Sequence, residues 1–154
     1  MPAAELHVRA TDADETMVRR ARAASYGWSS FRDLLESWLR SAFVHRGKRY
    51  YLRPRFRRLV WVELHDVRDS IPDDTYDLVL CRNLAFTSFE PELQREVADR
   101  LARALRPGGA LVIGSHEALP DGVPRLVPWC GRLGVFRAGC RPSLVTDFSR
   151  APPR

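Results

Sequence analysis

Apolar and polar positions follow one another along this chain in a pattern that predicts strands and helices in turn. Short apolar runs bounded by polar residues predict strands, and apolar positions three or four residues apart predict amphipathic helices. Strands are expected at about 5–10, 58–66, 76–82, 110–114 and 133–138. Helices are expected at 12–27, 29–43 and 91–105. The segment 43–53 should form a β-hairpin that turns at Arg46 and Gly47.

Local signals mark the ends of two of these helices. Ser30 and Asp33 have the spacing of a capping box at the start of the helix expected over 29–43. Pro91 suits the first position of the helix over 91–105. The run Arg106-Pro107-Gly108-Gly109 should end that helix and turn the chain into the next strand.

Two of the expected strands are apolar on both faces, at 79–81 and 110–113. Strands of this kind are covered by helices on both sides, which indicates a parallel sheet. The order strand, helix, strand, strand, helix, strand then predicts an α/β fold, a partial doubly wound (Rossmann-like) sheet. We expect one domain over 1–140, with the hairpin inserted at about 43–53, and a loose tail over 141–154.

Composition narrows the class of protein. The 154 residues carry a formal net charge of +6. The arginines are spread along the whole chain and Lys48 is the only lysine, so the charge does not mark a nucleic-acid-binding surface. The apolar runs are too short to cross a bilayer, and the N-terminal residues do not form a secretory signal. We therefore expect a cytoplasmic protein with no membrane partner.

Three cysteines are present without a CxxC spacing, namely Cys81, Cys130 and Cys140. This usage predicts reduced thiols and neither a disulfide framework nor a metal site. Cys81 lies in an apolar run and should be buried.

Every expected strand of the sheet ends in polar residues. These ends are Thr11-Asp12, His65-Asp66, Arg82-Asn83 and the run Gly114-Ser115-His116-Glu117. Ligands of open parallel sheets bind beyond the carboxyl ends of the strands. The pattern therefore predicts a cleft for a nucleotide-type cofactor at this edge.

Each candidate also has a plainer interpretation. Asp12 could accept hydrogen bonds from ribose hydroxyls, or it could cap the following helix in a box with Glu15. Asp66 could accept from an adenine amino group, or simply begin a loop. Arg82 could bind a carboxylate, or pair with a loop acid such as Asp69 or Asp73.

The same holds for the last strand end. His116 and Glu117 could form an acid/base pair, or be two solvated loop residues, and the residues favour the second interpretation.

Taken together, these motifs resemble the CheR-type methyltransferases, class I enzymes whose best-known members methylate glutamate side chains of chemotaxis receptors. The resemblance covers about residues 5–120. It rests chiefly on CRN after a buried strand and on RPGGALVIGSHE after the next helix. It implies S-adenosylmethionine as the cofactor and S-adenosylhomocysteine as its product.

The resemblance also implies roles for individual residues. Asp12 would hold the cofactor ribose, and Asp66 and Val67 would flank the adenine beside His65. Cys81 and Arg82 would line the cofactor pocket. The hairpin around Gly47 is similar to the small β-subdomain of receptor-methylating members.

Two departures from the family pattern stand out. A tyrosine near the active centre follows CRN in the family, and the nearest position here is Ser88. The family also has a first strand and a glycine-rich loop upstream of the strand that ends in Asp12, whereas this sequence has no glycine before Gly27. That first strand would be central, between the strand of Asp12 and the strand 76–82.

Three explanations compete for this second departure. The chain is a fragment, or a degenerate relative that no longer catalyses, or it is completed by another polypeptide. We favour the first.

The sequence thus predicts a CheR-type methyltransferase that is incomplete at its N-terminus. It would transfer a methyl group to an unknown acceptor, a protein carboxylate by analogy, although a small molecule is also possible. A carboxylate acceptor needs no general base, and the catalytic residues stay unknown. The alternative is a non-catalytic binding module derived from the same fold, and the sequence leaves open whether the chain is an enzyme.

Overall fold

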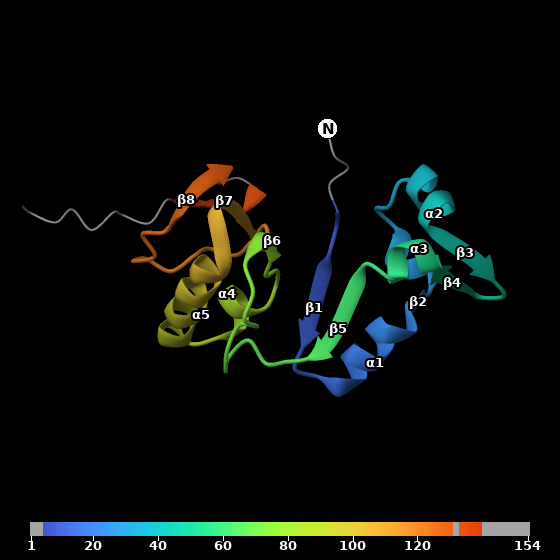
Figure 1. The fold of residues 1–154 in the computed structure, drawn as a ribbon, viewed down its shortest axis with the longest axis horizontal. Helices are drawn as coiled ribbons and strands as arrows, with labels where there is room; N and C mark the ends of the chain where they lie inside the picture. Colours follow the sequence, from blue (N-terminus) through green and yellow to red (C-terminus); the bar gives the residue numbers. More distant parts are fainter. Residues whose placement is uncertain (1–4, 131–132, 140–154) are drawn as a thin grey trace, which may run out of the picture. The chain divides into compact units, whose positions relative to one another are not determined.

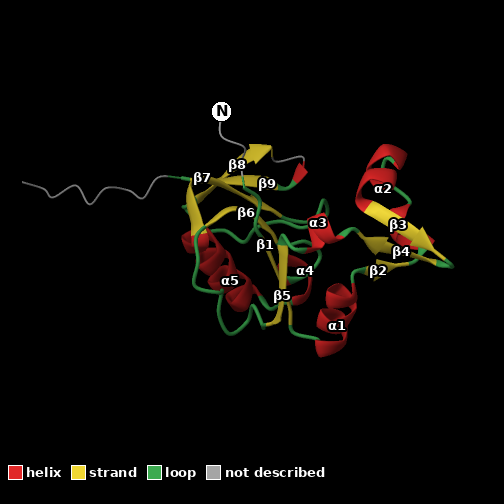
Figure 2. Ribbon diagram, turned by 45° about the vertical axis from the view of Figure 1, so that its right-hand side comes forward, coloured by secondary structure: helices red, strands yellow, loops and turns green. Residues whose placement is uncertain are grey.

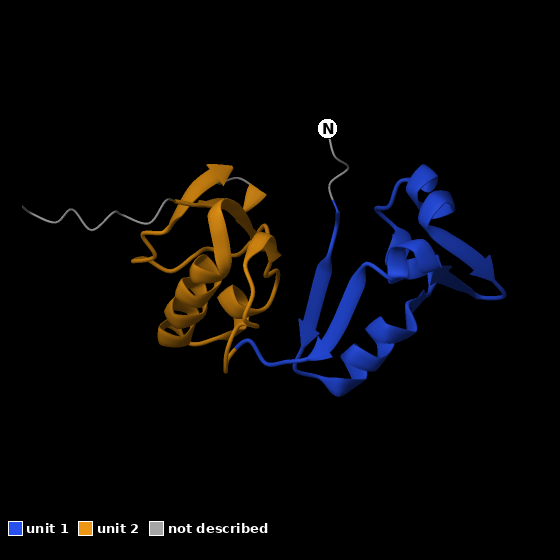
Figure 3. Ribbon diagram, viewed as in Figure 1, with its two compact units in different colours: residues 1–67 blue, residues 68–154 orange. Residues whose placement is uncertain are grey.

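The computed structural model describes residues 5–130 and 133–139, whose strands and helices are shown in Figure 1. The described chain divides into two compact units, residues 1–67 and residues 68–154 (Figure 3). Each unit has its own sheets and its own buried residues. The helices of the described residues include none with the length and apolar character of a membrane span.

The first unit contains a parallel pair of strands joined through a helix. β1 (Val8–Asp12) pairs with β5 (Val60–Leu64) over the full length of both, from Val8 opposite Val60 to Asp12 opposite Leu64. α1 (Glu15–Ala23) follows β1 and contacts both strands, with Val18 buried. This is the strand–helix–strand order and the parallel pairing that the sequence predicts.

The start of α1 differs from the prediction. The N-cap is Asp14, whose side chain accepts a 2.6 Å hydrogen bond from the Thr16 N–H. Asp12 instead accepts a 2.8 Å hydrogen bond from the Asp14 N–H and closes the turn before the helix. The capping box of Asp12 with Glu15 is therefore wrong, because the residue two positions further along already satisfies the first turn.

A small antiparallel sheet forms the rest of the first unit. Its strand order is β2 (Ser25–Tyr26), β4 (Arg49–Leu52), β3 (Phe43–Arg46). β3 and β4 form the expected hairpin, and Gly47 takes a φ of +59° at its turn, a conformation that costs glycine little. A short helix, α3 (Pro54–Arg57), follows the hairpin and leads toward β5.

The helix expected over 29–43 is wrong as one element. The chain forms a 3-10 turn η1 (Trp28–Phe31) and then a separate helix α2 (Glu36–Ala42), whose N-cap Leu35 is extended and receives no side-chain cap. The Phe31 ring is buried and packs edge-on against Phe43 at 4.8 Å and Tyr50 at 5.1 Å between centroids. The burial of this ring against the hairpin outweighs the helical spacing of apolar residues in this segment, so the chain does not form one continuous helix.

The second unit is built on a four-stranded mixed sheet. Its order is β6 (Tyr76–Leu80), β7 (Leu105–Val112), β9 (Val135–Ala138), β8 (Leu126–Cys130). β6 and β7 are parallel, and the other neighbours are antiparallel. The strand expected at 133–138 is confirmed as β9. β8 was not predicted from the sequence, because it contains Pro128 and is exposed along most of its length.

α4 (Ala85–Ser88) and α5 (Pro91–Ala104) connect β6 to β7. Pro91 occupies the first turn of α5 as expected, and α5 packs on β7, as Figure 2 shows. The core of the unit lies here and includes the buried residues Val97, Ala98 and Ala102 of α5, Leu111 of β7, and Ile113 directly after β7.

The run Arg106–Gly109 is a bulge within β7 rather than a turn before it. Tyr76 lies opposite Leu105, but Leu78 lies opposite Ala110, so four residues of β7 are accommodated beside one of β6. A side chain at Gly109 would lie 3.0–3.1 Å from three backbone oxygens, which explains why glycine stands there.

The α/β class and the parallel strand–helix–strand units are thus confirmed. The expected strands do not form one continuous sheet in the described residues: β1 has β5 as its one neighbour, and β6 has β7. The single domain over 1–140 stays a prediction, and the tail over 141–154 lies outside the described residues.

Candidate functional site

In the first unit, the parallel register brings two of the expected strand ends together. Asp12 and Leu64 are paired at the carboxyl ends of β1 and β5, and the His65 N–H donates a 3.0 Å hydrogen bond to the Asp12 carbonyl. Asp12 is exposed, and Asp66 and Val67, which follow directly, are half-buried. The structure therefore places Asp12, Asp66 and Val67 at one edge of the β1–β5 pair.

The Asp12 carboxylate is held by one hydrogen bond and keeps further acceptor positions open. Within the described part of the chain, the Asp14 N–H is its single donor, through one oxygen. A carboxylate has about four acceptor positions. The remaining positions of this exposed group can accept further hydrogen bonds, as a pair of ribose hydroxyls requires.

In the second unit, the carboxyl ends of β6 and β7 lie side by side. The Cys81 N–H donates a 2.9 Å hydrogen bond to the Val112 carbonyl and so continues the parallel ladder by one residue. Cys81 is buried as predicted, and its burial raises the pKa of the thiol, with Glu117 adding to this effect and a hydrogen bond from the Ala85 backbone opposing it. The Cys81 side chain is thus a neutral thiol at physiological pH.

Arg82 is exposed directly beyond β6. The ion pair with Asp69 or Asp73 does not form among the described residues. Both acids lie in the loop before the amino end of β6, whereas Arg82 follows its carboxyl end. The guanidinium is therefore available to a ligand at the edge where the sequence predicts the cofactor.

Glu117 has a role that the sequence reasoning missed. Its carboxylate accepts hydrogen bonds from the N–H groups of Gly114 at 2.6 Å, Asn83 at 2.7 Å and Leu84 at 3.2 Å. It also accepts one from the Thr87 hydroxyl at 2.7 Å. Glu117 thereby ties the loop after β7 to the loop after β6.

The hydrogen bonds of Glu117 decide between the two interpretations of His116 and Glu117, an acid/base pair or two solvated loop residues. Partial burial raises the pKa of Glu117, but the Thr87 hydroxyl and the three backbone donors outweigh it and hold that pKa below its usual value. His116 is exposed and makes none of these contacts, so the acid/base pair is not formed. The solvated-loop interpretation fits His116 and is wrong for Glu117. No sequence signal marks the partners of Glu117, since three of the four are backbone groups.

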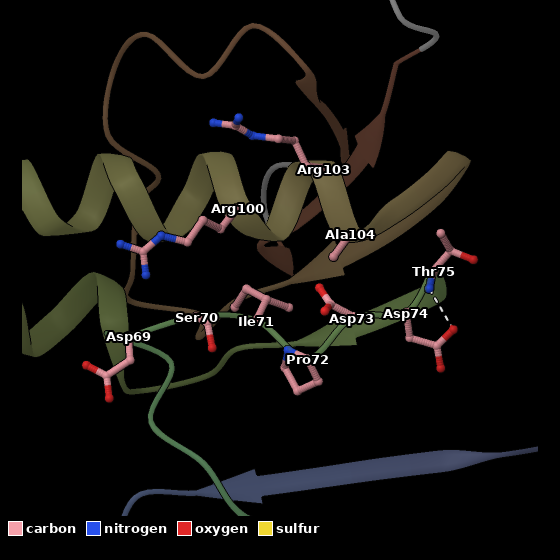
Figure 4. Close-up of a pocket in the computed structure, with 10 residues that line it drawn as sticks. All are labelled: Asp69, Ser70, Ile71, Pro72, Asp73, Asp74, Thr75, Arg100, Arg103 and Ala104. Atoms are coloured by element: carbon pink, nitrogen blue, oxygen red, sulfur yellow. Dashed lines mark hydrogen bonds between the residues drawn. The ribbon is translucent and has the colours of Figure 1, made fainter.

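An open pocket of the second unit lies elsewhere, with a volume of about 810 Å³. It is lined by the loop Asp69–Thr75 and by the end of α5, including Arg100 and Arg103 (Figure 4). Thr75 directly precedes β6 and Ala104 directly precedes β7, so the pocket lies at the amino ends of these strands. It contains none of the expected cofactor-binding residues.

The expected cofactor-binding residues are therefore divided between the two units. Asp12, Asp66 and Val67 lie at the strand ends of the first unit, and Cys81 and Arg82 at those of the second. Groups of three or more His, Cys, Asp or Glu side chains suited to a metal ion do not occur in the ranges 5–130 and 133–139.

The chain is similar in sequence to known methyltransferases. The family described as CheR methyltransferase, SAM binding domain, matches residues 2–131. A chemotaxis protein methyltransferase of Listeria innocua is 30% identical over 112 residues, which are 73% of this chain and 42% of that protein. A probable biofilm formation methyltransferase, WspC, of Pseudomonas aeruginosa is 32% identical over 154 residues, 93% of this chain and 36% of that protein.

A solved structure of the N-methyltransferase NodS from Bradyrhizobium japonicum, in complex with S-adenosylhomocysteine, is also similar to part of the chain. The similarity has a TM-score of 0.33 at 20% identity and covers 36% of this chain and 28% of that one. The chain spans about two fifths of the curated relatives described above, 42% and 36% of their lengths. The family match extends over most of the chain, and the chain therefore belongs to the CheR methyltransferase family, in the region of its S-adenosylmethionine-binding domain.

Proposed function

We propose that this chain binds S-adenosylmethionine and takes part in methyl transfer of the CheR type. One observation carries the proposal: the β1–β5 register places Asp12 beside His65 and Asp66 at a carboxyl edge. Carboxyl edges are where open α/β sheets bind nucleotides. The membership of the CheR family supports the same cofactor.

Each expected residue has a chemical task in this proposal. The exposed Asp12 carboxylate accepts hydrogen bonds from the two ribose hydroxyls, and Asp66 accepts from the adenine amino group. Val67 offers an apolar contact to the adenine ring. The neutral thiol of Cys81 lines the pocket without adding charge, and the Arg82 guanidinium binds a carboxylate.

The acceptor in this proposal is a protein carboxylate, by analogy with relatives that are named chemotaxis protein methyltransferases. The bound cofactor supplies an activated methyl group on a sulfonium sulfur. That methyl group would pass to an acceptor carboxylate, which is already deprotonated and would need no general base. The chain's contribution is then the positioning of the two reactants. Ser88, at the end of α4, stands where the family has a tyrosine, so no residue is assigned a catalytic role.

The proposal includes a further segment that contacts the amino-acid end of the cofactor, in addition to the contacts that this chain makes by itself. Within residues 5–130 and 133–139, neither carboxyl edge has a glycine-rich loop, whose N–H groups would hold the amino-acid end of the cofactor. β1 and β6 each have one strand neighbour in the described residues, which leaves an edge on each to which another strand could add. The cytoplasmic location stays a prediction.

A titration with S-adenosylhomocysteine tests the proposal. Isothermal calorimetry of the purified chain should give micromolar binding, and Asp12→Ala and Arg82→Ala should each weaken it about 10-fold or more, since a hydrogen bond to a charged group contributes roughly 1.5–3 kcal/mol. Asp121→Ala and Arg95→Ala remove exposed charges of the same kind elsewhere and should change nothing.

Two results would oppose the proposal. If the folded chain does not bind the product, the non-catalytic module is favoured. If Asp12→Ala and Arg82→Ala bind as well as the parent chain, the assigned residues are wrong.

A further inference from the structure

One carboxylate connects the two loops that leave the parallel strands of the second unit. Glu117 follows β7 and accepts four hydrogen bonds, of which those from Asn83, Leu84 and Thr87 come from the segment after β6. The fourth, from the Gly114 N–H, fixes Glu117 to its own loop. The shape of the segment after β6 therefore depends on a residue more than thirty positions away.

The backbone of that segment needs such support. Asn83 has a φ of +53°, in the left-handed region, and Leu84 has φ −136° and ψ −91°, which belongs to neither strand nor helix. In this conformation the N–H groups of both residues turn away from a regular ladder. The Glu117 carboxylate satisfies both N–H groups, and it thereby stabilises a backbone that is unfavourable in isolation.

Gly114 provides the space for this arrangement. A Cβ atom at position 114 would lie 2.5 Å from Asn83 Oδ1 and 2.7 Å from Glu117 Oε2, closer than real contacts of this kind. A glycine at the end of β7 and a carboxylate three residues later thus act together. The lack of space for a side chain at Gly114 supports the close approach of Asn83 and Glu117 independently of the hydrogen bonds.

The charge of Glu117 suits it to hold a loop rather than to exchange protons. Its four donors are N–H groups and a hydroxyl, and none is a cationic side chain. Several donors directed at one carboxylate favour its ionised form. A carboxylate with a lowered pKa is a poor general base near neutral pH.

We propose that Glu117 is a positioning residue of the cofactor site: it fixes the loop over 82–84 so that Arg82 and Cys81 present their side chains to the cofactor. This inference rests on the function proposed above. It assigns Glu117 no contact with the cofactor, and it makes cofactor affinity depend on the hydrogen bonds that the carboxylate accepts.

The test measures S-adenosylhomocysteine affinity, thermal stability and backbone amide shifts in the same variants. Glu117→Gln keeps the size of the side chain but turns one acceptor oxygen into a donor that faces N–H groups. We expect its affinity to fall about 10-fold and the amide resonances of Asn83 and Gly114 to move. Glu92→Gln, an exposed glutamate of α5, is the matched control and should leave both unchanged.

A second pair of variants keeps the inference testable if Glu117→Gln does not fold. Thr87→Val removes the hydroxyl that bonds to Glu117 with little change in volume, and Thr87→Ser retains it. We expect Thr87→Val to weaken product binding about 3-fold or more and Thr87→Ser to bind as the parent chain does. A general loss of stability would not separate the serine and valine variants in affinity in this way.

The outcomes distinguish the inference from the proposed function. If the parent chain binds the product and Glu117→Gln binds equally well although its amide resonances have moved, the positioning role is wrong and the cofactor proposal stands. If the folded parent chain does not bind at all, the cofactor proposal is wrong and the positioning role is lost with it.

Discussion

Two carboxylates at strand ends, Asp12 and Glu117, differ in what surrounds them. Asp12 is exposed and has one internal donor, whereas Glu117 is half-buried and has four. A carboxylate with free acceptor positions can bind a ligand, and one whose positions are filled by its own chain can only hold structure. Asp12 is the last residue of β1 and Glu117 lies in the loop after β7, and nothing in the sequence around them distinguishes their surroundings.

The pKa of Glu117 predicts how its contribution to stability depends on pH. Its folded pKa lies below the usual 4.5. The stabilisation is therefore fully present above that usual value and is lost as the pH falls through the folded pKa. Urea denaturation should show the largest difference in unfolding free energy between the parent chain and Glu117→Gln at about pH 7, and a much smaller one at about pH 3. An equal difference at both pH values would contradict this account.

Gly114 is predicted to be intolerant of a side chain. Gly114→Ala forces Asn83 or Glu117 to move and should lower the unfolding free energy by roughly 1–3 kcal/mol, as overpacking does. Gly27→Ala is the control, because a Cβ there lies 3.9 Å from its nearest neighbour, Ser29 Oγ. Denaturation of both variants by guanidinium chloride provides the measurement, and a Gly114→Ala chain as stable as Gly27→Ala would show that the close approach is absent.

At the scale of elements, the small antiparallel sheet depends on a cluster of rings. Phe31 is buried and lies within 4.8–6.1 Å of the rings of Tyr26, Phe43 and Tyr50. Trp28, in the same 3-10 turn, is 63% exposed. The two neighbouring aromatic residues should therefore contribute very differently to stability.

Phe31→Ala is expected to destabilise the first unit by about 3–5 kcal/mol, the usual cost of truncating a buried phenylalanine. Trp28→Ala should cost less than about 1 kcal/mol, because most of its ring is already in water. Thermal unfolding followed by circular dichroism compares them. Similar losses in the two variants would mean that the ring cluster is not the core of this sheet.

The sequence predicts elements well where local pattern and packing agree. The strands ending at Asp12 and near Leu80, the hairpin at Gly47 and the long helix from Pro91 all have strong local signals, and all are present. The helix over 29–43 failed because packing of Phe31 outweighed its helical spacing. The contacts of Glu117 could not be predicted, since they join loops that are distant in sequence through backbone groups.

At the scale of the whole molecule, the chain belongs to the CheR methyltransferase family. The CheR match extends over residues 2–131, and the chain spans 42% of a Listeria relative. The described strands form separate sheets, with Asp12 and Asp66 in one unit and Cys81 and Arg82 in the other. We propose that the strand ends of both units bind the cofactor, and residues of each unit should therefore respond to it.

The most direct measurement is a nuclear magnetic resonance titration of the isotope-labelled chain with S-adenosylhomocysteine, read at the backbone amides. Cofactor binding at these strand ends should shift the amide resonances of residues 12–14, 65–67 and 81–84, and none in the loop 69–75 that lines the open pocket. Shifts confined to that loop, or no shifts in a folded chain, would contradict the claim that the carboxyl ends of these strands form the cofactor site.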